Sequence, residues 1–168
     1  MDSFDEQLIK RQLNKKDYGI FVMTLFAGAV LLFLTLMLSP LLFPIVLIVL
    51  CIAIYFIVTS RNLEFEYSVT NGTITIDKVI NKQRRKSVIS VDARSIESMG
   101  KYDSSEHKDN SYKKIYASQK DNNGGWYFTV HHQKFGNVLV VFDPNEKILK
   151  DIKPFLRGQV AVNAFIRH

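Results

Sequence analysis

The feature that most constrains this chain is a long apolar segment, residues 18–58, which contains no charged side chain. Its main interruption is the Ser39-Pro40 pair near the middle. A helix rises 1.5 Å per residue, so roughly 20 apolar residues cross about 30 Å of hydrocarbon, and the segment is long enough for two crossings. The sequence therefore predicts a transmembrane helical hairpin. The predicted hairpin covers residues 18–60, with its helices at about 18–38 and 41–58.

Two other interpretations of this segment are weaker. A cleaved secretory signal would have a shorter apolar core and a small-residue cleavage site, whereas here a second apolar run follows the first directly. A re-entrant loop around residues 39–44 would need protein or water around its backbone at membrane depth. The single cysteine, Cys51, lies in the second run, so no intramolecular disulfide can form. Polar groups are too few inside the hairpin for a transport pathway, which favours an anchor.

Cations flank both ends of the hairpin. Lys10, Arg11, Lys15 and Lys16 precede the first helix and Arg61 follows the second, whereas the turn between the helices carries no charge. Because positive residues are retained on the cytoplasmic side, both termini are expected in the cytoplasm. The prediction is a multi-pass protein of the plasma membrane.

Residues 1–17 are predicted to form an amphipathic, interfacial helix. Ser3 and Glu6 have the spacing of a capping box, and Phe4, Leu8 and Ile9 fall on one helical side with cations beside them. A short solvated helix without membrane contact is the alternative that this pattern leaves open.

The rest of the chain, residues 61–168, has the size of one independently folded domain. It begins with alternating apolar and polar residues, followed by Asn71-Gly72, which is a strong β-hairpin signal. Residues 101–110 are almost without apolar side chains and are predicted to be a mobile loop. Strands are predicted at residues 63–70, 73–80, 87–91, 96–99, 113–118, 126–132 and 137–142.

The chain is predicted to end in an amphipathic helix at about residues 144–156. Asp143 is a suitable N-cap, Pro144 suits the first helical position, and Glu146 completes a capping box. Residues 159–168 are expected to form an extra strand or a loose tail.

This order of elements resembles a known family. The segments Tyr67–Ile74, Arg84–Val91, Ile96–Met99 and Phe142–Glu146 are similar to those of bacterial pleckstrin-homology-like (PH-like) domains, and the whole chain resembles uncharacterised bacterial membrane proteins that place such a domain after two crossings. The resemblance implies an α+β fold in which a seven-stranded antiparallel barrel or sandwich is capped by a C-terminal helix. It implies a fold and not an activity.

No catalytic, cofactor or metal site is predicted. His131 and His132 are adjacent on a strand, so their side chains point to opposite faces and cannot bind one metal ion together. No nucleophile or phosphate-loop motif occurs. Glu64 and Glu66 fall on the polar face of a predicted strand and are expected to be solvated surface charges.

The one concentrated feature of the domain is cationic. Lys78, Lys82, Arg84, Arg85 and Lys86 gather around the second predicted turn of the sheet. Near a cytoplasmic membrane surface they are candidates for contact with anionic headgroups or a partner, each cation contributing on the order of 1 kcal/mol. The alternative is that they only solubilise a turn. Nucleic acid is not expected as a ligand, because no binding motif or aromatic platform accompanies the charge.

Two functions are compatible with these observations. The first is a membrane-anchored, non-catalytic binding or scaffold module that presents its cytoplasmic domain to anionic lipid or to a protein, including a second copy of itself. The second is an accessory subunit of a larger membrane enzyme or transporter complex.

Overall fold

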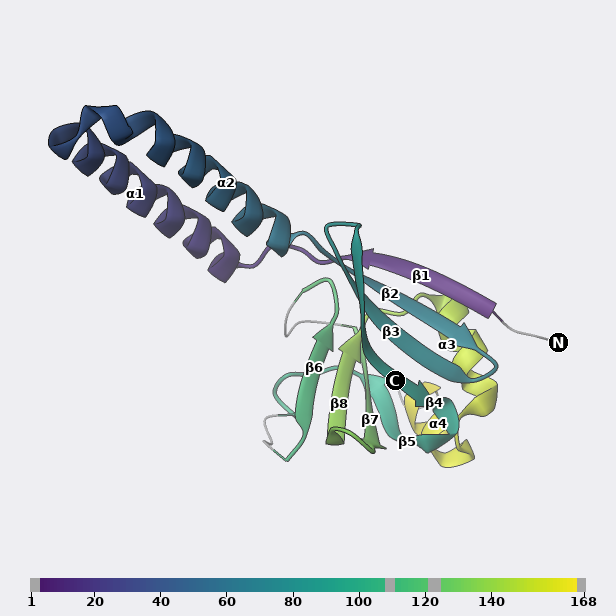
Figure 1. Cartoon of the computed structure of the whole chain (residues 1–168). Helices are drawn as coiled ribbons and strands as arrows, with labels where there is room; N and C mark the ends of the chain where they lie inside the picture. The colour runs from purple at the N-terminus through teal and green to yellow at the C-terminus, as the bar shows by residue number, and fades with distance from the viewer. Residues whose placement is uncertain (1–3, 108–110, 121–124, 166–168) are drawn as a thin grey trace.

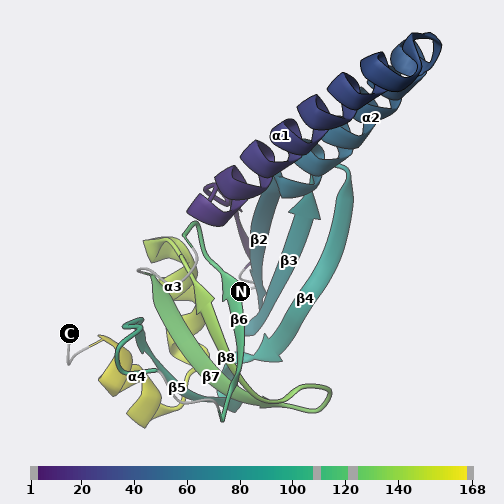
Figure 2. The same cartoon turned by 90° about the vertical axis from the view of Figure 1, so that its left-hand side faces the viewer.

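The computed structural model describes residues 4–107, 111–120 and 125–165. Two long helices lie side by side and project from a domain built of two β-sheets and short C-terminal helices (Figure 1). Seen from the side, the helices continue beyond the ends of β2, β3 and β4 (Figure 2). The domain and the helical projection therefore meet at one end of a sheet.

The projection consists of α1 (Lys15–Leu38), the 3-10 turn η1 (Pro40–Leu42) and α2 (Phe43–Arg61). Both helices are long and apolar enough to cross a membrane, and only 6% and 0% of their most apolar windows are buried inside the protein. This exposure distinguishes them from the core helix of a soluble domain. α1 begins before the predicted position because Asn14 caps it in a capping box with Asp17.

The helix predicted within residues 1–17 is wrong for the described part. Residues Phe4–Lys10 form strand β1, which pairs antiparallel with β2 (Leu63–Thr70) from Phe4↔Thr70 to Lys10↔Glu64. Asp5 and Ile9 are buried, and the side chains between them are more exposed, as in a strand with one buried face. So short an apolar pattern is compatible with a helix or with a strand. The segment forms a strand because it can pair with the free edge of β2. Ser3 lies outside the described residues.

This pairing places the helical hairpin inside a sheet connection. The chain leaves β1, forms α1 and α2, and returns as the neighbouring strand β2. The two ends of the hairpin are consequently held together at one end of the sheet.

The prediction of seven antiparallel strands in a barrel or sandwich is also corrected. The described residues form two four-stranded sheets, in the orders β1-β2-β3-β4 and β5-β7-β8-β6, and β6 runs parallel to β8. The additional strand is β1, and the parallel pair arises because β6 joins the far edge of the second sheet. The remaining strands are β3 (Thr73–Ile80), β4 (Arg84–Asp92), β5 (Ile96–Lys101), β6 (Lys113–Ala117), β7 (Trp126–His132) and β8 (Gly136–Phe142).

Tyr67 joins the two sheets across the core. Its ring is fully buried and lies edge-on to Phe142, with 5.7 Å between ring centroids. Its hydroxyl donates to the carbonyl of Ala117 and accepts from the amide of Asp143 at 3.1 Å. Burial, which disfavours the phenolate, raises the pKa of Tyr67 far above its usual range. Because both backbone groups would otherwise be unpaired in the core, this hydroxyl fixes how the sheets meet.

The C-terminal region differs from its prediction. α3 (Glu146–Ile152) is capped by Asn145, whose side chain accepts from the amide of Ile148 at 2.8 Å. Asp143 is not the cap, because its carboxylate accepts from the amide of Gln119 at 2.7 Å. The turn η3 (Lys153–Phe155) follows, and α4 (Gly158–Phe165) replaces the predicted strand or tail as far as the described residues extend.

The described part of the predicted loop 101–110 lies against the second sheet. Lys101 ends β5, and the His107 ring lies 4.2 Å from the Tyr127 ring between centroids. Tyr102 is also buried. Its burial is the main cause, and a hydrogen bond with Tyr116 a second cause, of the rise in the pKa of Tyr102 to about 12. Residues 108–110 lie outside the described part.

Candidate functional site

Asp17 lies at the junction between the helical hairpin and the domain. Its side chain is almost fully buried, and its carboxylate contacts Arg11 at 3.3 Å and Arg61 at 3.2 Å. It also accepts from the backbone amide of Asn14 at 3.0 Å. One carboxylate thereby ties the segment after β1, the first turn of α1 and the last turn of α2.

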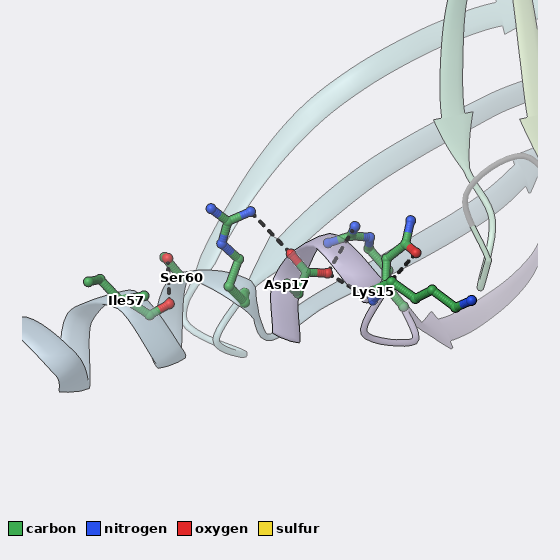
Figure 3. Close-up of polar contacts among 7 residues, drawn as sticks. Lys15, Asp17, Ile57 and Ser60 are labelled. Carbon is green, nitrogen blue, oxygen red and sulfur yellow. Dashed lines mark hydrogen bonds and ion pairs between the residues drawn. The ribbon is translucent and has the colours of Figure 1, made fainter. Parts of the chain in front are cut away.

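The geometry of this junction is visible in Figure 3, where Asp17 on the first turn of α1 faces the end of α2 near Ser60. The position suits an acid, because the first turn of a helix exposes unpaired amides that stabilise negative charge. The contacts of the two arginines with Asp17 join opposite charges, and the Asp17 carboxylate is largely excluded from water. We call Arg11, Asp17 and Arg61 the junction cluster.

The predicted cationic residues lie beside this junction. The turn between β3 and β4 adjoins the end of α2, because the amide of Asn81 donates to the carbonyl of Asn62 at 2.8 Å. Asn81 and Lys82 both adopt positive φ, 51° and 56°, and close this turn tightly. Lys82 is therefore held next to the residue that follows the second apolar helix.

The structure divides the five predicted residues rather than joining them in one site. Arg85 lies on one face of β4 and forms an ion pair with Glu66 at 2.6 Å. Arg84 and Lys86 alternate with it and lie on the other face. Lys78 is half-buried and has an interaction partner. Lys82, Arg84 and Lys86 are exposed, and no ion pair within the described ranges neutralises them; we call these three the basic edge.

The prediction that Glu64 and Glu66 are solvated is wrong. Each residue is only 6% exposed, because β2 is an inner strand and residues of β1 and β3 lie directly opposite both glutamates. Burial raises the pKa of Glu66 above its usual range, and a hydrogen bond with the Glu6 carboxyl raises it further, while Arg85 opposes the shift. Glu66 is therefore part of the packed sheet.

Another ion pair fastens β1 to the C-terminal region. Lys147 of α3 donates to Asp5 at 2.7 Å, and this hydrogen bond raises the Lys147 pKa. The Gln7 side chain donates to the carbonyl of Asp143 at 3.1 Å and accepts from the amide of Asn145 at 2.7 Å. The strand that precedes the helical hairpin is thus held from two directions.

The histidines are used separately. His131 contacts Asn137 at 2.7 Å, whereas His132 stacks on Phe135 with 5.0 Å between centroids. Among the residues that the structure describes, no group of three or more His, Cys, Asp or Glu side chains could hold a metal ion.

Sequence reasoning missed the junction cluster. Asp17 is a single acid within a cationic flank, and its position three residues after Asn14, the spacing of a capping box, is the local signal that could have found it. The partnership with Arg61 could not be found in this way, because it joins residues 44 positions apart.

Comparison with known families gives one match that covers nearly the whole chain. The model of the family described as "Bacterial PH-like domain (DUF6106)" matches residues 1–162. No curated protein and no solved structure matches the chain.

Replacing Asp17 with Asn should loosen the junction. Arg11 and Arg61 would lose their shared counter-charge, and removing one partner of a buried ion pair costs about 3 kcal/mol. The thermal unfolding midpoint of the detergent-solubilised chain should fall, and trypsin should cut faster between residues 10 and 16. Glu97→Gln removes the same charge at an exposed position and serves as the control. Equal stability of Asp17→Asn and the wild type would contradict the assigned role.

Glu66→Gln should change how stability depends on pH. The pKa of Glu66 is raised in the folded state, so the folded chain keeps this proton after the unfolded chain has lost it near pH 4.3. Its contribution is present below that pH and is lost as the pH rises through the folded pKa. The unfolding midpoint of Glu66→Gln relative to the wild type should therefore rise between pH 4 and pH 7. A difference that is constant with pH would refute this assignment.

Proposed function

Because the chain belongs to the family of bacterial PH-like domains, a class of binding and scaffold modules, we propose that it is a membrane-anchored, non-catalytic binding module. The apolar hairpin α1–α2 is the anchor, and the PH-like domain is held at the cytoplasmic surface of the plasma membrane. The basic edge contacts anionic lipid headgroups and presents the rest of the domain to a protein partner.

The exposed apolar surface of the hairpin supports the anchor. Large side chains such as Met23, Phe26, Met37 and Leu41 are more than two-thirds exposed, and covering so much apolar surface by lipid is strongly favourable. The pairing of β1 with β2 supports the topology, because residues on either side of the hairpin lie in one sheet and hence on one side of the membrane. The flanking cations favour the cytoplasmic side.

The position of the basic edge is the single observation that carries the headgroup contact. The turn that bears Lys82 is hydrogen-bonded to the residue directly after α2, so Lys82 lies next to the end of the apolar span, and Arg84 and Lys86 follow it on β4. Three exposed cations near an anionic surface contribute about 3 kcal/mol together. The Glu66 carboxylate is already engaged by Arg85 and does not neutralise them.

The topology can be tested by cysteine labelling. In a Cys51→Ala background, a membrane-impermeant maleimide should label Ser39→Cys in intact cells. Lys134→Cys, in the turn between β7 and β8, should be labelled only after permeabilisation. In the chain that keeps Cys51, this thiol should resist labelling in both conditions, because it lies within the second apolar helix, out of reach of a membrane-impermeant reagent. Recovery of the chain in the soluble fraction, or the reverse labelling pattern, would refute the anchor.

The headgroup contact can be tested with an environment-sensitive dye on Gln83→Cys, in the Cys51→Ala background and in nanodiscs. Phosphatidylglycerol should shift the dye emission toward an apolar environment relative to pure phosphatidylcholine, and 0.5 M salt should abolish the shift because it screens the charges. Lys82→Glu, Arg84→Glu and Lys86→Glu together should remove the shift. Reversing Lys134, Lys150 and Lys153, which lie elsewhere on the domain, should leave it intact. An emission that ignores lipid charge would exclude the contact.

The accessory-subunit function is a second candidate because of one apolar groove. It has a volume of about 380 Å³ and is lined by one face of α1, including Thr24, Gly28 and Leu31, together with Leu50 of α2. A neighbouring transmembrane helix would fit such an apolar groove, in which Thr24, Ala27 and Gly28 are small enough to allow close approach. This alternative requires a larger particle in mild detergent, whereas the module proposed above is recovered by itself or as copies of itself.

A further inference from the structure

A cavity of about 610 Å³ opens at the junction, on the side of the helical hairpin away from the basic edge. It lies where β1 ends and α1 begins. Its lining consists of the continuous segment Leu8–Leu13, Tyr18 and Gln119. The cavity therefore has one wall from the sheet edge, one from the first turns of α1 and one from the segment after β6.

The walls of this cavity are fixed by backbone hydrogen bonds. The amide of Arg11 donates to the carbonyl of Leu63 at 2.9 Å, and the amide of Gln12 donates to the carbonyl of Gln119 at 2.8 Å. The ion pair of Arg11 with Asp17 holds the same segment against α1. A site that is already formed requires little ordering when a ligand enters it.

The lining combines three kinds of side chain. Lys10 is exposed, and its ammonium group has no ion pair within the described ranges. Gln12 and Gln119 carry amides that donate and accept hydrogen bonds. Leu13 and Tyr18 are 43% and 57% exposed, next to the start of the apolar helix. Along the chain toward the hairpin, the lining thus changes from a cation to neutral polar groups and then to apolar side chains.

We propose that this cavity binds one anionic glycerophospholipid. Its phosphate contacts Lys10, its headgroup hydroxyls bind the amides of Gln12 and Gln119, and the upper part of one acyl chain packs on Leu13 and Tyr18. The inference rests on the proposed function, because the cavity is at headgroup depth only if α1 and α2 cross the membrane. It adds a defined single-lipid site to the diffuse contact of the basic edge.

Charge and polarity favour a lipid over a protein segment. An anionic headgroup complements the free Lys10, whereas the other cation of the lining, Arg11, is satisfied by Asp17. A lipid also matches the change from polar to apolar lining within a few ångströms of the helix start, and aromatic side chains such as Tyr18 are favoured at this interface.

The proposal can be tested by native mass spectrometry of the full chain released from nanodiscs of phosphatidylcholine and phosphatidylglycerol in a 4:1 ratio. The wild type should retain one phosphatidylglycerol. Lys10→Gln should lower this retention at least about tenfold, as expected for loss of one charge-assisted contact. Lys16→Gln is the matched control, because Lys16 is exposed on the same helical turn as Asp17 but does not line the cavity. Tyr18→Ala should lower retention of both lipids.

Each other outcome overturns the proposal. Equal losses in Lys10→Gln and Lys16→Gln would assign the effect to general surface charge, and retention of no lipid by the wild type would exclude the site. A dimer without lipid, broken by Lys10→Gln, would assign the cavity to a second copy. These results leave the anchor intact if the cysteine labelling pattern holds, whereas a chain that does not enter nanodiscs contradicts the proposed function itself.

Discussion

The antiparallel pairing of β1 with β2 is the interaction on which the rest of this structure depends. It places Lys10 opposite Glu64, so the chain must leave the sheet and return to it at the same end. The two apolar helices thus form the connection between the neighbouring strands β1 and β2. Both ends of the apolar hairpin are therefore attached to the same sheet. The domain is connected to the hairpin at two points, so it is held more rigidly than a single linker would hold it.

Because of Asp17, the cations at the domain end of the hairpin are of two kinds, those in ion pairs with it and those left exposed. Arg11 precedes the first apolar helix and Arg61 ends the second, and both form ion pairs with this one buried carboxylate, which fixes the helix ends. The cations that are left exposed, Lys10 on one side and the basic edge on the other, are held by backbone hydrogen bonds of the adjoining segments. An ion-paired centre with exposed cations on both sides suits the contact with an anionic surface that is proposed above.

Several buried ionisable groups hold the elements of the domain together. Its buried ionisable side chains are used in packing: Glu66 is paired with Arg85, Asp5 with Lys147, and the Tyr67 hydroxyl with two backbone groups between the sheets. These groups connect β1, β2, α3 and the second sheet. The fold supports the proposed binding role through the position of the domain relative to the hairpin.

The sequence by itself determined the elements whose signals are local. Residues 18–58 are apolar without a charge, Asn71-Gly72 tolerates positive φ, and the alternation after Leu63 requires one buried face, so hairpin, turn and strands could be read directly. Only the tertiary structure decided the rest. Phe4–Lys10 forms a strand because the edge of β2 is available for pairing. Asp143 accepts a hydrogen bond from the amide of Gln119 instead of capping the helix. Asp17 forms an ion pair with Arg61, at the other end of the hairpin sequence. Such choices depend on partners distant along the chain, which no local pattern records.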